Sequence, residues 1–189
     1  MKIPNMTDRR VRRTRRLLRD ALLELVLQRG WDDVSVSDIC EHAEVGRSTF
    51  YTHFAHKEAL LLSGFDDLRE HLRAATSSTG NGRSAPFSFL RGLIEHVQEN
   101  RRLFRAIVGK HAGQLAQKNF RQFVFGLVRE DLAAALPDAG DIEAASRYIS
   151  GGISELLIWS VDVRPAREST DLESSCLQLT KPILATLRR

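Results

Sequence analysis

The stretch from residue 47 to residue 54, RSTFYTHF, combines two aromatic side chains with short hydroxyl side chains. Phe50 and Phe54 are four residues apart, so they would share one face of a helix. At about 100° per residue, the opposite face carries three hydroxyl side chains, those of Ser48, Thr49 and Thr52. Short side chains let a helix approach the base edges of a DNA major groove, whereas bulky ones would hold it away. The chemistry predicted for this face is hydrogen bonding to bases.

Charged and polar residues beside that face are predicted to contact DNA as well. Arg47 could bind a guanine with two hydrogen bonds or contact a phosphate. Four further residues are better placed for phosphates, whose contacts set register but not sequence: Ser35, Tyr51, His53 and Lys57.

A second short helix is predicted just upstream to support the first. Ser35 is a good N-cap, and Asp38 lies three residues on, near the capping-box position. Ile39 and Ala43 are four apart and share a face. The run Glu44-Val45-Gly46 then breaks the pattern, and Gly46 can begin the next helix. Two short helices joined by a tight turn form a helix-turn-helix.

The stretch SVSDICEHAEVGRSTFYTHFAHK, residues 35–57, resembles the signature of TetR/AcrR-type transcriptional repressors. That signature reads roughly Thr-Val-x-x-Ile-Ala-x-x-Ala-Gly-Val-Ser-x-Gly-Thr-Phe-Tyr-x-His-Phe-x-x-Lys-x-x-Leu, and the resemblance covers about 45 residues once the preceding helix is included. The resemblance implies an all-α protein with a three-helix DNA-binding head. It also implies a phosphate contact for Lys57, which explains a cation at the start of a helix, where the dipole disfavours one.

Three residues depart from the family pattern. Glu44 stands at the turn glycine, Gly46 at the usual N-cap serine, and Ser48 at the usual glycine of the second helix. An acid near phosphate weakens binding slightly, and Gly46 removes a hydroxyl that often contacts phosphate in the family. These changes are expected to alter operator preference rather than abolish binding.

The charge of the chain is concentrated at its N-terminus. The protein has 189 residues and a net charge of +4, yet its first 19 residues carry eight basic side chains against one acid. The arginine run from residue 9 to residue 16 has two interpretations. It either begins a solvated helix, or it contacts phosphates or the minor groove beside the helix of residues 47–54, as in some relatives of the family. A basic end on a mildly acidic body suggests a polyanionic partner.

Apolar periodicity predicts helices along the whole chain and no strand. The expected helices are, approximately, 11–29, 35–43, 47–54, 57–75, 86–100, 103–108, 115–136, 142–161 and 171–187. This is an all-α protein in which a long fourth helix joins the head to a helical body. On the resemblance, we expect residues 1–56 to form the arm and DNA-binding domain, and residues 57–189 the effector-binding and dimerisation domain.

The last two expected helices are predicted to pair with their copies in a homodimer, as a four-helix bundle. Their apolar residues recur on narrow stripes, near a 3.5-residue period in the second helix. The candidate interface residues are Ile149, Ile153, Leu156, Leu172, Cys176, Leu179 and Ile183. Two heads one helical turn apart would then bind a palindrome.

Aromatic residues of the body have two readings. At helical spacing most of its phenylalanines are expected in the core. The resemblance adds a small-molecule effector pocket, with candidate walls Phe104, Phe123 and Trp159 and candidate polar residues His111 and Arg105.

The remaining motifs favour no catalysis and no cofactor. The chain has no glycine-rich phosphate loop or nucleophile elbow. His53 and His56 straddle a helix end without a completing ligand, so no metal is expected. Cys40 and Cys176 fit buried, reduced thiols of a cytoplasmic protein, and no apolar run is long enough to cross a membrane.

The combined hypothesis is a DNA-binding repressor that an effector releases from a palindromic operator. The alternative is an effector-independent scaffold on DNA whose body binds a protein partner. A ligand-sized cavity favours the first, and a packed body with a large exposed apolar patch favours the second. An activator also fits the sequence.

Overall fold

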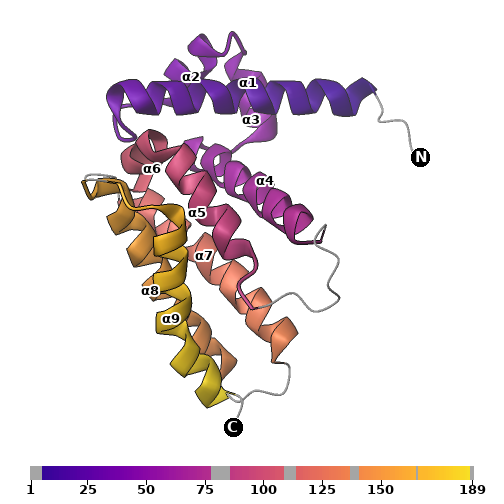
Figure 1. The fold of residues 1–189 in the computed structure, drawn as a ribbon. Helices are drawn as coiled ribbons and strands as arrows, with labels where there is room; N and C mark the ends of the chain where they lie inside the picture. The colour runs from indigo at the N-terminus through magenta and orange to yellow at the C-terminus, as the bar shows by residue number, and fades with distance from the viewer. Residues whose placement is uncertain (1–5, 78–85, 109–113, 137–140, 165, 188–189) are drawn as a thin grey trace. The chain divides into compact units, whose positions relative to one another are not determined.

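The computed structural model describes residues 6–77, 86–108, 114–136, 141–164 and 166–187. Within these ranges the protein is built from nine helices and contains no strand, which confirms the predicted all-α class (Figure 1). The helices are α1 (Met6–Arg29), α2 (Val36–His42), α3 (Arg47–His53), α4 (Lys57–Ser77), α5 (Phe89–Glu99), α6 (Arg101–Val108), α7 (Gln114–Ala135), α8 (Ile142–Asp162) and α9 (Ser169–Leu187).

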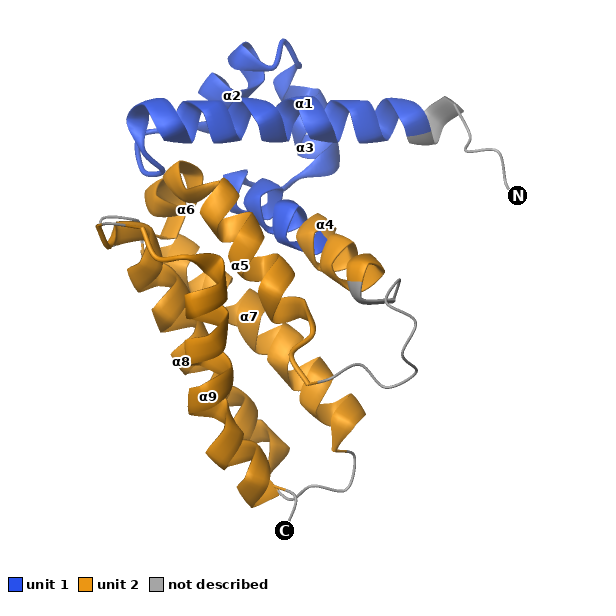
Figure 2. Cartoon of the chain, in the orientation of Figure 1, with its two compact units in different colours: residues 1–66 blue, residues 67–189 orange. Residues whose placement is uncertain are grey.

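The chain divides into two compact units, residues 1–66 and 67–189 (Figure 2). The division falls inside α4, between Asp66 and Asp67, so this helix contributes residues to both units. The sequence analysis placed the boundary between the two functional domains earlier, between residues 56 and 57, at the start of α4. That functional division remains a prediction.

The first unit holds the two short helices against α1. The inner face of α1 is fully apolar, with Leu18 and Leu22 completely buried. Gly30 ends the helix at φ +86°, a left-handed conformation that favours glycine, and its N–H bonds to the carbonyl of Val26 at 2.9 Å. Trp31 is buried directly after this turn. Helix α1 thus ends at a defined residue, and a six-residue segment leads from it to α2.

The second unit is a helical bundle around a second core. Helix α8 contacts α5, α6, α7 and α9, and α5 also contacts α9. The most deeply buried side chains come from several of these helices: Leu93, Ile94, Phe120, Leu132, Leu157 and Leu172. None of the helices in the described ranges is long and apolar enough to span a membrane.

Helix α5 begins at Phe89, three residues later than the sequence predicted. Phe87 has φ +65°, a left-handed conformation that interrupts a right-handed helix. Its ring is buried, and its N–H donates to the Asp131 carboxylate at 2.8 Å. Burial of the ring and the bond to Asp131 hold Phe87 in this strained conformation. The sequence predicted a helix start at Pro86 and did not reveal the strained residue after it.

Candidate nucleic-acid interface

Helix α3 has the two-faced structure that its sequence predicts. Phe50 is completely buried and Phe54 nearly so, with their ring centroids 5.8 Å apart. The guanidinium of Arg15 lies 5.1 Å from the centroid of the Phe54 ring, a cation–π contact from α1. The residues on the other side of α3 are exposed: Arg47, Ser48, Thr49, Tyr51 and Thr52.

The hydroxyl groups of α3 are close to its backbone and to the turn. Thr52 Oγ1 donates to the carbonyl of Ser48 at 2.9 Å, within the helix. A Cβ atom added to Gly46 would lie 3.8 Å from Ser48 Oγ and 3.9 Å from Thr49 Oγ1. Both hydroxyls therefore gather at the start of α3, while Thr52 must rotate away from the Ser48 carbonyl to donate to a base.

Helix α2 begins with a complete capping box. Ser35 Oγ accepts a bond from the Asp38 N–H at 3.2 Å, and Ser35 N–H donates to Asp38 Oδ2 at 2.8 Å. The Ser35 hydroxyl also donates to the same carboxylate. These bonds to Ser35, followed by Arg29, hold the Asp38 pKa below its ordinary value of 3.8. The Ser35 hydroxyl thus has an internal role beside its predicted phosphate contact.

The turn between α2 and α3 is made by Glu44, at φ +52°. Its N–H bonds to the carbonyl of Glu41 at 3.1 Å, and the next N–H, of Val45, bonds to the carbonyl of Cys40 at 2.9 Å. The left-handed residue explains why glycine suits this position. Here an exposed acid occupies it at a conformational cost.

Lys57 is held inside the first unit. Its ammonium donates to the carbonyl oxygens of Trp31 and Val34, at 2.8 and 2.7 Å, and lies 4.8 Å from the centroid of the Trp31 ring. It therefore ties the start of α4 to the loop after α1. An ammonium has three donors, so these two bonds leave one, and the phosphate contact of Lys57 remains a prediction.

The other aromatic residues of α3 differ in exposure. Tyr51 is 58% exposed, and its ring meets the Phe50 ring edge-to-face, with centroids 5.4 Å apart. His53 is half-buried, and its ring lies 6.3 Å from that of Phe54. His42 pairs with Glu24 at 2.7 Å. Among the described residues no three His, Cys, Asp or Glu side chains form a metal-binding cluster.

In the second unit, two predicted pocket residues lie in one aromatic cluster. Phe104 and Phe123 are both buried and flank Phe120, with centroid distances of 5.8 and 6.5 Å. The His96 ring packs edge-on against Phe104 at 5.7 Å. Burial, the largest cause, lowers the pKa of His96, which favours a neutral ring. Arg69 lies over Phe123, 5.7 Å from its centroid.

The other predicted pocket residues lie elsewhere. Trp159 is 42% exposed, and its ring carries the Arg167 guanidinium at 5.5 Å. Arg105 is exposed and pairs with Asp162 at 3.1 Å. His111 lies outside the described residues. The aromatic cluster is thus the part of the predicted pocket that the structure brings together.

Most of the predicted dimer-interface residues lie in the protein's own core. Four of the seven have at most 3% of their surface exposed: Ile149, Ile153, Leu172 and Cys176. Leu156 and Ile183 are half-buried, and Leu179 is 67% exposed. The four core residues bind the helices of one chain together and offer a second copy little surface.

Sequence reasoning missed three structural roles. The Lys57 bonds could have been anticipated, because a cation at a helix start needs a partner other than the dipole. The packing of His96 against Phe104 carries no local signal, since it joins α5 to α6. The same holds for Glu130, which pairs with Arg69 at 2.9 Å and also with Arg73, joining α7 to α4.

Comparison with known proteins agrees with this geometry. The family model described as "Bacterial regulatory proteins, tetR family" matches residues 18–63, which include α2, α3 and the start of α4. The HTH-type transcriptional regulator TcmR of Streptomyces glaucescens is 34% identical over 108 residues, 57% of this chain and 42% of TcmR. The chain spans less than half the length of the curated relatives that it matches.

Solved structures share the fold over nearly the whole chain. A TetR transcriptional regulator from Streptococcus agalactiae 2603V has a TM-score of 0.65 at 22% identity, covering 92% of this chain and 97% of its own. Thermus thermophilus FadR, a TetR-family repressor in complex with lauroyl-CoA, has a TM-score of 0.57 at 22% identity, covering 88% and 92%.

A buried aromatic face, a capped supporting helix and an exposed hydroxyl face together define a helix-turn-helix DNA-binding unit. Residues 18–63 of the chain belong to the tetR family of bacterial regulatory proteins, and the chain as a whole has the fold of TetR transcriptional regulators.

Proposed function

We propose that this protein represses transcription by binding a palindromic operator as a homodimer, and that a small-molecule effector releases it. The observation that carries the proposal is the exposed face of α3, which is opposite the buried Phe50 and carries Ser48, Thr49 and Thr52. A helix anchored on one side by aromatic packing, with short hydroxyl side chains on the opposite side, fits a major groove. Arg47, at its start, is exposed and available to a guanine or a phosphate.

The dimer would form through the outer surfaces of α8 and α9. These two helices contact each other and carry three large, exposed apolar residues, Tyr148 (73% exposed), Trp159 (42%) and Leu179 (67%). Gly152 is also exposed, and a Cβ atom added to it would meet nothing within 4 Å. A second copy can therefore approach the α8 backbone closely, and burying three such side chains supplies a driving force.

Effector control would act through α4 and α7. Glu130 on α7 pairs with Arg69 and Arg73 in the second half of α4, and the first half of α4 belongs to the DNA-binding unit. Arg69 also lies over Phe123 in the aromatic cluster. A ligand that separates these rings would move α7, and Glu130 would carry that movement to α4. The lauroyl-CoA complex of Thermus thermophilus FadR supports a ligand for a body of this fold.

The test of DNA recognition is selection of bound duplexes from a random-sequence library, followed by affinity measurements at several salt concentrations. The expected result is a short palindrome whose binding weakens steeply with salt. Thr49→Ala should change the selected sequence while the variant remains folded, because Thr49 is exposed. Selection of no shared sequence would instead support the scaffold, for which the exposed apolar residues of α8 and α9 would be the protein-docking surface.

The effector proposal has its own test. A ligand library is screened by thermal shift against the wild-type protein, and each hit is then tested for release of the selected operator. Phe104→Leu and Phe123→Leu keep an apolar core but change the shape of the aromatic cluster, so both should lose the response. A hit that releases DNA equally from both variants would place the effector site elsewhere.

A further inference from the structure

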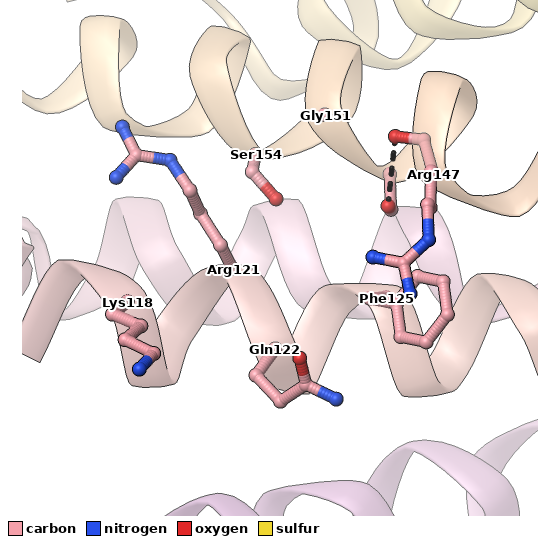
Figure 3. Close-up of a pocket in the computed structure, with 8 residues that line it drawn as sticks. Lys118, Arg121, Gln122, Phe125, Arg147, Gly151 and Ser154 are labelled. Carbon is pink, nitrogen blue, oxygen red and sulfur yellow. Dashed lines mark hydrogen bonds between the residues drawn. The ribbon is translucent and has the colours of Figure 1, made fainter.

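A basic groove lies between α7 and α8, outside the aromatic cluster and the DNA-binding unit (Figure 3). It has a volume of about 350 Å³, the size of a site for one small ligand. Each helix contributes residues at positions i, i+3, i+4 and i+7, which is one continuous face. The lining residues are Lys118, Arg121, Gln122, Phe125, Arg147, Ser150, Gly151 and Ser154.

The charge of this groove is positive. Three of the lining residues, Lys118, Arg121 and Arg147, are cations, and none is an acid. Each arginine already has an acidic neighbour, Glu155 for Arg121 at 3.1 Å and Glu143 for Arg147 at 2.7 Å. A guanidinium has five donors, however, so one carboxylate leaves several free for a further anion. The Arg147 guanidinium is also fixed over the Phe125 ring, at 5.1 Å.

Ser154 gives the groove a polar floor. Serine in a helix commonly donates to a carbonyl one turn back, as Ser150 does to Arg147 at 3.2 Å. The Ser154 side chain is completely buried, and its hydroxyl has no hydrogen-bond partner among the described residues. Figure 3 shows this hydroxyl pointing from α8 toward α7, beside Arg121. A buried hydroxyl without a partner is destabilising, and a bound acceptor would remove that cost.

We propose that the α7–α8 groove binds a small organic anion through a carboxylate or phosphate group. The oxyanion accepts bonds from Ser154 Oγ, Lys118 Nζ and Arg121, and the rest of the molecule lies toward Phe125 and Arg147. The groove is open above Gly151, where an added Cβ atom would meet nothing within 4 Å. The groove is concave and its serine hydroxyl is buried at the base, so a folded protein surface could not follow it, which favours a small molecule over an acidic protein partner.

The experiment is titration of the purified full-length protein with inorganic phosphate and with benzoate, at constant ionic strength, followed by calorimetry and thermal shift. The expected result is saturable binding of at least one anion, with a dissociation constant on the order of millimolar. Tighter binding of benzoate would identify an aromatic carboxylate as the ligand class, and tighter binding of phosphate a phosphorylated compound. Saturation by neither would overturn the proposal.

Two variants test the residues, and a third controls for surface charge. Lys118→Gln should weaken binding about tenfold. Ser154→Ala should weaken it about fivefold without lowering the melting temperature of the free protein, because the hydroxyl has no internal partner to lose. Arg102→Gln removes an exposed cation of α6 and should bind as the wild type does. Equal losses in all three would reveal a diffuse charge effect, and wild-type binding by Ser154→Ala would show that Ser154 only allows close helix packing.

Discussion

At the scale of single residues, Glu44 adopts a strained backbone conformation in the turn between α2 and α3. A non-glycine residue at φ +52° costs about 1–2 kcal/mol. Glu44→Gly should therefore raise the free energy of unfolding by about 1 kcal/mol. Urea denaturation measures this change.

A matched control separates the turn from a general effect of glycine. Glu41 is also exposed and acidic, but it lies within α2. Glu41→Gly should lower stability by about 1 kcal/mol, because glycine is unfavourable inside a helix. Changes of the same sign in both variants would show that the Glu44 conformation is not strained. Either substitution also removes a negative charge, which should raise DNA affinity if the turn approaches phosphate. Glu44→Gly alone should combine that gain with greater stability.

Lys57 allows a structural role and a DNA role to be measured separately. Lys57→Met keeps the apolar stem but leaves the Trp31 and Val34 carbonyls without their donor, which should cost about 2 kcal/mol of stability. Under conditions where the variant is fully folded, it should bind operator and unrelated DNA more weakly by the same factor, with a shallower salt dependence. Unchanged stability would contradict the internal bonds, and unchanged DNA affinity would limit Lys57 to them.

At the scale of helices, the capping box of α2 makes stability depend on pH. The pKa of Asp38 is lowered from 3.8 in the folded state, chiefly by Ser35, so its ionised form is favoured by folding. The stability that Asp38 contributes is fully present above its unfolded pKa and is lost as the pH falls through the lower folded pKa. Asp38→Asn should be less stable than wild type at neutral pH, and the difference should shrink below pH 3.8. Chemical denaturation across this range measures it, and a gap independent of pH would contradict the ionised cap.

The local features of the DNA-binding unit could be predicted well from the sequence. The Ser35 cap, the phenylalanine face of α3 and the end of α1 at Gly30 depend on neighbours within a few residues, and the structure has all three. Periodicity was equally effective for the nine helices of the described ranges, since an apolar stripe is a local property.

The distribution of apolar residues between core and interface could not be predicted. A stripe at helical spacing shows that Ile153 or Leu172 is buried, but not whether its own chain or a second copy buries it. The structure shows both in their own core, because one side of α8 packs against α5, α6, α7 and α9. Contacts between distant helices, such as Glu130 with Arg69, depend on the tertiary arrangement and have no sequence signature. The prediction of the pocket residues was the least successful, because these residues come from several helices.

At the scale of the whole molecule, the proposed function requires that two chains present two copies of α3. If α8 and α9 hold the dimer, Leu179→Glu should place a charge in the interface and dissociate it, while the fold survives because Leu179 is 67% exposed. Operator affinity should then fall about tenfold or more, because one head alone binds a half-site. Sedimentation velocity gives the oligomeric state, and fluorescence anisotropy with the selected palindrome gives the affinity.

Leu115→Glu is the matched control for this experiment. Leu115 is 47% exposed but lies near the start of α7, away from α8 and α9 in the sequence. It should leave both the dimer and operator binding unchanged, so a loss in Leu179→Glu alone assigns the interface to α9. A Leu179→Glu protein that remains dimeric and binds the operator with wild-type affinity would exclude this surface. The apolar residues exposed on α8 and α9 would then be free to bind a different protein, as the scaffold alternative requires.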